Sequence, residues 1–266
     1  MDILKRNLAP ISSQAWDEID SLARDTLRAS LSARKFVDVS GPHGIDHTNI
    51  NLGRLTVPKN QKGSDVLYGV YDVKPLIETR VRFSLKMWEL DNIERGARDV
   101  ELDGLEHAAK QIAAFEEQAV YDGFADVKIT GLKELAAAQA VQVNLTQDEL
   151  LEGIAEGMNK LLAAGIDAPA TLVAGEKLWK FLAHAAPGGS IKSMVERITS
   201  GKVVYAPGVS GGFLAADRGD DFVLHLGQDF AIGYHSHTTE EVNLFLMESF
   251  TFQVLTPEAV VGLNIS

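Results

Sequence analysis

One pentapeptide of the 266-residue chain has the pattern that exposes a serine nucleophile in some hydrolases. Residues 208–212 read Gly-Val-Ser-Gly-Gly, which matches the G-x-S-x-G form of a sharp turn between a strand and a helix. Strand-like residues stand on both sides, at 202–205 and 213–216, and no helical pattern follows the turn. The segment therefore predicts a glycine-rich hairpin loop, and a hydrolase that uses Ser210 is the alternative interpretation.

Histidines that lie close together in the sequence are the candidate metal ligands. His43 and His47 form one such pair, and His235 and His237 form another, beside glycine and polar residues. Imidazoles can hold a metal when a carboxylate converges with them, but loop histidines are more often exposed and unligated. The helical segment at 105–120 carries no Glu-x-x-His pair of the ferritin-like kind. We therefore expect neither a metal site nor a catalytic residue in this chain.

One aromatic residue is a candidate for binding a planar ligand. Trp88 follows an alternating strand pattern, and its indole could present a stacking face to a ring such as a flavin. A lone tryptophan is more often part of the packing, and no glycine-rich phosphate loop of either common form is present. Ring stacking at Trp88 is thus the one ligand contact that the residues suggest.

The elements that must position these residues are amphipathic helices and half-buried strands. Ser12 and Ser13 precede a helical stripe of apolar residues, so they predict a helix with a serine cap at its start. Alternation of apolar with polar and charged residues predicts a strand at 77–86 that buries one face. Further helices are expected at 105–120 and 150–162, and strands dominate the last quarter. This mixture predicts an α+β protein whose two lobes share strands.

Residues 52–76 predict a long hairpin that protrudes from the body of the protein. Polar and turn-forming residues at 58–65 separate two short strand-like runs. An isolated two-stranded ribbon is marginally stable in water, and its apolar faces need cover. The pattern therefore predicts oligomerisation.

Composition and charge limit the partners of the protein. Hydrophobic residues make up 45% and charged residues 23% of the chain, which is typical of a globular protein. The 37 acidic and 25 basic side chains give a net charge of −12, which argues against a nucleic-acid partner. No apolar run approaches the length of a membrane span or a signal peptide. Because cysteine is absent, which fits a reducing compartment, we expect a cytoplasmic protein without a membrane partner.

Five blocks of sequence, in the same order, resemble the type 1 encapsulin family, formerly called linocin-like bacteriocins. The first two are residues 4–6 with 9–10 (LKR and AP) and residues 33–39 with 41–42 (ARKFVDV and GP). The others are residues 88–96 (WELDNIERG), 227–234 (GQDFAIGY) and 248–254 (ESFTFQV). The resemblance covers nearly the whole chain.

The resemblance implies an α+β fold of the Hong Kong 97-type phage capsid kind in a single chain. It assigns residues 1–40 to an N-terminal arm and helix, and residues 52–76 to an extended loop that pairs with a neighbouring copy. Residues from about 77–135 together with 220–266 would form the peripheral domain, and about 136–219 the axial domain. The predicted hairpin is explained by this arrangement.

The resemblance also implies the function of a self-assembling shell rather than of an enzyme. Family members form closed icosahedral nanocompartments in the cytoplasm, often of about sixty copies. The shell encloses a cargo enzyme that carries a C-terminal targeting peptide, frequently a ferritin-like iron-storage protein or a dye-decolourising peroxidase. Iron or haem would then belong to the cargo, and the shell itself requires no cofactor. The alternatives are a prophage major capsid protein, which shares the fold, and a bacteriocin-like hydrolase that uses Ser210.

Two sites are implied by the same resemblance. Arg34, Asp38, Phe230 and Ile232 match cargo-docking positions, where apolar pockets take a peptide's alternate side chains and the charged pair fixes its direction. The plain alternative is that Phe230 and Ile232 belong to the core. The loop that lines the fivefold pore of family shells matches Ala186, Pro187, Gly188, Gly189 and Ser190. Its small, uncharged side chains predict a pore that selects mainly by size.

Overall fold

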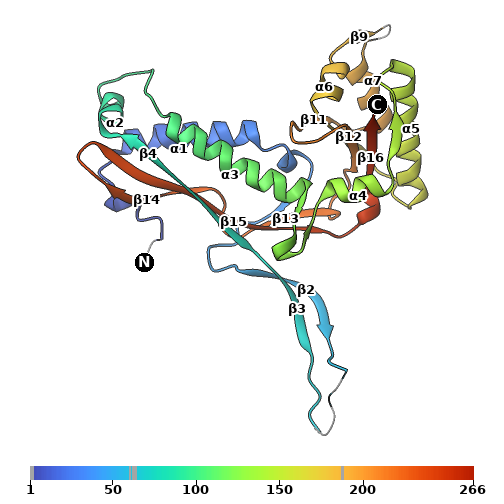
Figure 1. Ribbon diagram of the computed structural model, residues 1–266, viewed down its shortest axis with the longest axis horizontal. Coiled ribbons are helices and arrows are strands. Elements are labelled where there is room, and N and C mark those ends of the chain that lie inside the picture. The colour runs from blue at the N-terminus through green and yellow to red at the C-terminus, as the bar shows by residue number, and fades with distance from the viewer. Residues whose placement is uncertain (1–2, 60, 62–64, 187–188) are drawn as a thin grey trace.

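The N-terminal helix begins where the serine cap predicts it. The computed structural model describes residues 3–59, 61, 65–186 and 189–266. Helix α1 (Ser13–Ser30) is capped by Ser12, whose side-chain oxygen accepts a 3.1 Å hydrogen bond from the Ala15 N–H. Its apolar face packs against α3 (Asp103–Tyr121), and the two helices run along one face of a sheet (Figure 1). No helix in the described ranges is long and apolar enough to cross a membrane.

The sheet beneath these helices is built around one long strand. Strand β15 (Glu241–Val254) pairs with β13 (Phe222–Leu226) and β14 (Ala231–His237) on one side, and with β4 (Ile77–Lys86) on the other. Strand β1 (Asp38–Ser40) joins β13 in parallel. The alternation predicted for 77–86 is confirmed, because Phe83 and Leu85 are buried against α1 and α3. We call this sheet with α1 and α3 the long lobe.

A second sheet forms the compact lobe at the other end of the molecule (Figure 1). Its strand order is β11 (Val203–Tyr205), β8 (Ala170–Ala174), β12 (Gly212–Ala216), β16 (Val260–Ile265) and β7 (Val141–Val143). The strands β8 and β12 are buried at every position, as expected for the centre of a sheet covered on both faces. The helices of this lobe are α4 (Leu132–Ala138), α5 (Gln147–Ala163), α6 (Glu176–Leu182) and α7 (Ile191–Thr199).

The chain crosses from one lobe to the other between β15 and β16, which differs from the expected domain boundaries. Strand β15 lies in the long lobe, whereas β16 pairs with β12 and β7 in the compact lobe. The expectation that all of 220–266 belongs with 77–135 is therefore wrong for residues 260–265. A short apolar strand fits either sheet, so its pattern alone does not select its partners.

The segment at 208–212 is not the hairpin loop that its sequence predicts. Strands β11 and β12 both pair with β8, one parallel and one antiparallel, so β8 lies between them. The segment therefore passes over the end of β8 to reach its far side. No helix follows Ser210, because the chain enters β12 directly, so the strand-to-helix context of a nucleophile elbow is missing.

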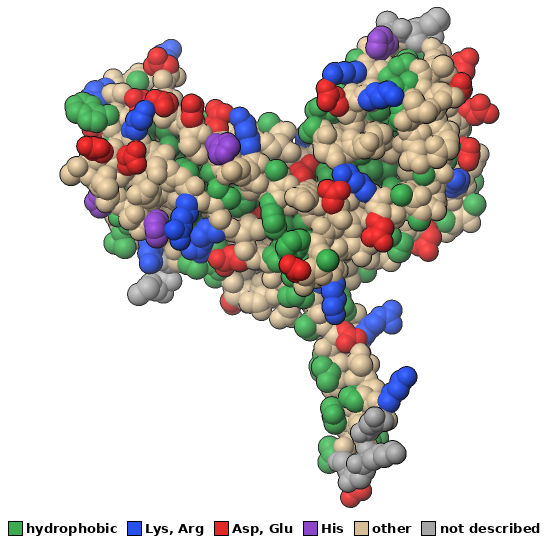
Figure 2. All heavy atoms as spheres, viewed as in Figure 1, with side chains coloured by type: hydrophobic (Ala, Val, Ile, Leu, Met, Phe, Trp, Pro, Cys, Tyr) green, Lys and Arg blue, Asp and Glu red, His purple; other side chains and the backbone are tan. Residues whose placement is uncertain are grey.

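A two-stranded hairpin protrudes from the body, as residues 52–76 predict (Figure 1). It consists of β2 (Asn49–Thr56) and β3 (Val70–Pro75), which pair with each other and with no other strand of the described chain. Figure 2 shows hydrophobic atoms along its length. Many of its apolar side chains are exposed: Leu55, Val57, Val66, Leu67, Tyr68, Val70, Tyr71 and Val73. The hairpin thus has no core of its own.

Short elements complete the chain. Helix α2 (Met87–Glu94) follows β4 directly and was not predicted from the sequence. The remaining strands are β5 (Gly123–Phe124), β6 (Ile129–Thr130), β9 (Ala185–Ala186) and β10 (Gly189–Ser190), and the 3-10 helices are Arg6–Leu8, Ala33–Lys35, Ala125–Val127 and Pro257–Ala259.

Candidate functional site

A groove with a volume of about 530 Å³ lies between α1 and β14 on the long lobe. One wall comes from α1 and the residue that follows it. Ala23, Leu27 and Leu31 are each separated by one helical turn and supply apolar surface. Arg24 and Arg28, which are exposed, line the same wall. The opposite wall is the edge strand β14 with the residues before it: Asp229, Phe230, Ala231 and Ile232.

Arg34 closes one end of the groove and binds three carboxylates. Its Nε lies 3.0 and 3.1 Å from the two carboxylate oxygens of Glu116, and its Nη1 donates to Asp229 over 2.9 Å. Its Nη2 donates to both Glu116 and Glu248. The side chains of Glu116 and Glu248 are fully buried, whereas Asp229 is 41% exposed and faces the groove. Arg34 is therefore the counter-ion of a buried acidic pair.

The cluster raises the pKa of both Arg34 and Glu248, for different reasons. Burial lowers the pKa of Arg34, but the hydrogen bond and charge of Glu116, with the charges of Glu248 and Asp229, raise it overall. Burial first, and then the charge of Glu116, raise the pKa of Glu248 well above its ordinary value. A single guanidinium cannot neutralise two buried carboxylates and Asp229 together, so Glu248 holds a proton more readily than a surface glutamate.

Three of the four expected docking residues meet in this groove. The guanidinium carbon of Arg34 lies 4.7 Å from the ring centroid of Phe230, and Asp229 accepts a 2.8 Å hydrogen bond from the Phe230 N–H. Phe230 is half-buried, so part of its ring is available to a ligand. Ile232 is 3% exposed and packs within the core of α1, α3 and the sheet.

Asp38, the fourth expected docking residue, lies outside the groove. It stands on β1, where its Oδ2 accepts a 2.6 Å hydrogen bond from the Asp220 N–H in the turn before β13. The structure therefore does not bring Asp38 to the groove together with Arg34. The guanidinium is already held by other carboxylates, and Asp38 stabilises a turn in which Asp220 has a φ of 62°.

The two buried acidic partners of Arg34, Glu116 and Glu248, were missed by the sequence analysis, although the sequence contains a signal for each of them. Glu116 stands on the apolar stripe of α3, one helical turn from the buried Ile112 and Val120. Glu248 lies within the buried run of β15. A charged residue at a buried position of an apolar pattern indicates a buried pair, because such residues are almost never buried alone.

The N-terminal arm borders the groove. The carbonyl of Leu4 accepts a 2.7 Å hydrogen bond from the Tyr234 N–H, so the arm covers part of the open edge of β14. Arg6 forms a 2.7 Å ion pair with Asp20 on α1, and its guanidinium carbon lies 3.9 Å from the ring centroid of Trp16. These contacts fix the arm along α1.

The expected pore loop lies at the tip of the compact lobe, between α6 and α7. Ala186 and Gly189 pair across the short ribbon of β9 and β10, and Pro187 and Gly188 lie outside the described residues. Ser190 caps α7, since its hydroxyl accepts a 3.2 Å hydrogen bond from the Ser193 N–H. The loop is therefore attached to the start of a helix.

The other candidates from the sequence remain apart from this groove. Trp88 on α2 is 70% exposed, with the guanidinium carbon of Arg95 at 5.4 Å from its ring, so ring stacking there stays a prediction. The hollow that contains Ser210 is lined by no histidine that could act as a base. Within the described residues, no group of three histidine or acidic side chains is arranged to hold a metal ion.

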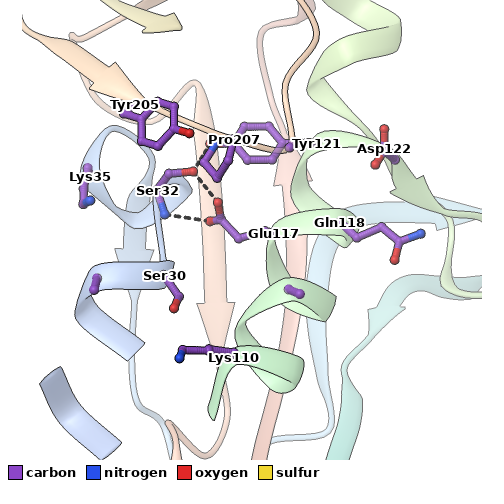
Figure 3. Close-up of a pocket in the computed structure, with 13 residues that line it drawn as sticks. Ser30, Ser32, Lys35, Lys110, Glu117, Gln118, Tyr121, Asp122, Tyr205 and Pro207 are labelled. Carbon is purple, nitrogen blue, oxygen red and sulfur yellow. Dashed lines mark hydrogen bonds between the residues drawn. The ribbon is translucent and has the colours of Figure 1, made fainter. Parts of the chain in front are cut away.

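A second cavity, of about 600 Å³, lies where the two lobes meet (Figure 3). Glu117 on α3 accepts hydrogen bonds from the Ser32 and Ala33 N–H groups over 3.0 and 2.8 Å, and also from the Ser32 hydroxyl. That hydroxyl lies 2.6 Å from the Tyr121 hydroxyl. Burial raises the pKa of both Glu117 and Tyr121. The network holds the end of α1 against α3 and faces Pro207 of the compact lobe.

Comparison with known proteins identifies relatives over the whole chain. A family model described as encapsulating protein for peroxidase matches residues 1–251. A type 1 encapsulin shell protein of Rhodospirillum rubrum is 42% identical, with 99% of this chain and 97% of that protein covered. A type 1 encapsulin shell protein of Rhodococcus erythropolis is 36% identical, with 99% and 100% covered.

Solved structures show the same fold at much lower identity. The virus-like particle from Pyrococcus furiosus has a TM-score of 0.66 at 16% identity, with 92% of this chain and 97% of that chain covered. The capsid of Myoviridae phage XM1 has a TM-score of 0.56 at 13% identity, with 87% and 90% covered. These neighbours establish an α+β fold of the Hong Kong 97 capsid type. The chain belongs to the encapsulin family of shell proteins.

Proposed function

We propose that copies of this chain assemble into a closed nanocompartment that encloses a cargo protein, which docks by a targeting peptide in the groove between α1 and β14. Membership of a shell-protein family and the protruding apolar hairpin support the assembly. The observation that carries docking is the groove itself, in which the half-buried Phe230 lies beside an edge strand. An extended peptide fits such a groove, because its alternate side chains fall into apolar pockets.

The cargo that this proposal favours is an iron-dependent enzyme. The description of the matching family names a peroxidase, which supports a dye-decolourising peroxidase, and a ferritin-like iron-storage protein is the second candidate. Iron or haem then belongs to the cargo, and the shell acts without a cofactor. We further propose that the compartment lies in the cytoplasm, and that the loop at 186–190 borders a pore that selects mainly by size.

The assembly is tested by the mass and shape of the purified recombinant protein. Light scattering is expected to give one species of about 1.7 MDa, the mass of about sixty chains of 28.8 kDa, because closed symmetric shells have a fixed copy number. Negative-stain images of the same peak are expected to show uniform hollow particles. A monodisperse monomer or dimer would contradict the proposal.

Docking in the groove is tested by loading of a tagged cargo. The shell is co-expressed with a fluorescent protein that carries a randomised C-terminal tail, and the tails that co-purify inside the shells are sequenced. With the most enriched tail, Phe230→Ala is expected to lower loading about 10- to 100-fold, since burial of a phenylalanine contributes about 1.5–3 kcal/mol.

Phe115→Ala is the matched control, because Phe115 is 36% exposed on α3 and does not line the groove. Equal loading of the two variants would show that cargo does not dock at Phe230. If no tail is enriched by the wild-type shell, docking of a cargo by its C-terminal tail is itself wrong.

A further inference from the structure

Among the described residues, three buried polar atoms at the root of the hairpin have no hydrogen-bond partner. They are Nε2 of His47, Nε2 of His225 and Oγ1 of Thr251. His225 and Thr251 stand opposite each other on β13 and β15, so their side chains leave the sheet on the same face. Buried polar groups in folded proteins are almost always satisfied by protein, water or an ion. Three neighbouring exceptions therefore indicate an occupant.

The loop before β2 closes over this face of the sheet. The Gly44 N–H donates a 2.9 Å hydrogen bond to the Gly227 carbonyl at the end of β13. A Cβ at Gly227 would lie 2.9 Å from the His47 carbonyl oxygen and 3.0 Å from the Leu76 side chain, so only glycine allows this approach. His47 and the end of the hairpin are thus packed onto the strand that carries His225.

Two histidines and a lysine lie near His225. Burial lowers the pKa of His225, and the charges of His43, His47 and Lys74 lower it further, against a hydrogen bond with Gln253 that raises it. The rings of His43 and His47 are 4.8 Å apart between centroids. Lys74 on β3 is half-buried, burial lowers its pKa, and no ion pair joins it to a described carboxylate.

The carboxylates on the neighbouring elements are engaged elsewhere or exposed. Asp72 on β3 accepts a 3.0 Å hydrogen bond from the Thr56 hydroxyl, and Glu78 on β4 forms a 3.0 Å ion pair with Arg80. Asp38 on β1 is bonded to the turn before β13, and Asp46 on the covering loop is exposed. The half-buried Lys74 has no internal counter-ion among the described residues, which favours an anion from solvent.

We propose that Lys74, His47, His225 and Thr251 form a binding site for a small inorganic anion of the size of chloride. The ammonium of Lys74 supplies the charge, and the two imidazole N–H groups and the threonine hydroxyl donate hydrogen bonds. The two imidazole nitrogens and the threonine oxygen are fully buried, so this side of the site suits a monatomic ion better than a large oxyanion. The bound anion joins the covering loop, the sheet and β3, and so fixes the direction in which the hairpin leaves the body.

The site is tested on the full-length purified protein with chloride as the probe. Replacing gluconate by chloride at constant ionic strength is expected to raise the thermal unfolding midpoint by about 2–4 °C, through binding to the folded state. Lys74→Met is expected to lose this shift, whereas Lys35→Met, which removes an exposed lysine elsewhere, retains it. Crystals soaked in bromide are expected to show an anomalous peak beside His225 and Thr251.

A second variant tests whether the Thr251 hydroxyl binds the anion. Thr251→Val replaces a fully buried hydroxyl by a methyl group of the same shape. If the hydroxyl binds the anion, the variant loses part of the chloride-dependent shift. If the hydroxyl has no ligand, the variant is equally or more stable in both salts. An unchanged chloride response in both Lys74→Met and Thr251→Val, or the absence of a bromide peak, would overturn the proposal.

Discussion

Replacing Arg34 by alanine is expected to destabilise the folded chain by about 3–5 kcal/mol near neutral pH, the usual cost of breaking a buried ion pair. The guanidinium is the shared cation of Glu116, Asp229 and Glu248. Two of these carboxylates are fully buried and cannot regain water when the cation is removed. Phe230 also loses the guanidinium against its ring, so the groove is expected to change shape.

The loss in this variant depends on pH, because the buried carboxylates can take up protons. Without Arg34, the pKa of Glu248 in the folded state rises further, and Glu248 releases its proton on unfolding. The stability of the variant therefore falls as pH rises. Urea denaturation at about pH 5 and about pH 8 is expected to show a larger deficit at the higher pH. An equal deficit at both pH values would contradict this electrostatic account.

Glu248→Gln is the matched comparison within the same cluster. The folded pKa of Glu248 is raised, so its protonation stabilises the fold below its ordinary pKa, and this contribution is lost as pH rises through the folded value. Glutamine keeps the shape and does not titrate. We expect the variant to be at least as stable as wild type above that folded value. A loss as large as that of Arg34→Ala would mean that Glu248 pairs with Arg34 as an ion.

Local elements of this fold were predictable, because their signals lie within the elements themselves. Ser12 caps α1 where the sequence places a cap, and the alternation at 77–86 forms β4 with Phe83 buried. Helix α2 was missed since it begins at Met87 directly after that strand, without a side-chain cap. Each of these results depends on neighbours along the chain.

Long-range pairing could not be predicted in the same way. The pattern of residues 260–265 contains no information that selects β12 and β7 as partners of β16. The insertion of β8 between β11 and β12, which removes the expected hairpin at 208–212, is likewise a property of the whole sheet. In both cases, several strands have similar local sequence patterns, and the burial of apolar surface in the whole sheet decides which of them pair.

The groove was predictable only in part. Resemblance to a family located Arg34, Phe230 and Ile232, and the structure brings these three together. The structure places Asp38, the fourth residue, outside the groove, where it accepts a hydrogen bond from the turn at Asp220. The ion pairs of Arg34 could not be predicted from the sequence around it, because its buried partners, Glu116 and Glu248, lie on α3 and β15.

Replacing the outer hairpin by a short turn is expected to abolish the shell while leaving the body of the chain folded. The change substitutes an Asn-Gly turn for residues 53–72, so that the root of β2 and β3 remains. The removed strands pair only with each other in the described chain, and their apolar side chains are exposed. Light scattering is expected to show a fall from the mass of a shell to that of a small species, with little change in thermal unfolding.

Point variants test whether the apolar surface of the hairpin, rather than its length, drives assembly. Leu55 and Tyr71 are 52% and 70% exposed on facing strands, so Leu55→Lys with Tyr71→Lys places two charges where a neighbouring copy must bury the hairpin. A buried unpaired charge costs several kcal/mol, and each subunit of a closed shell repeats that cost. Leu162→Lys, at a 56% exposed position on α5, is the matched control and is expected to assemble normally. Intact shells from the double variant would show that the hairpin does not carry the contact between copies.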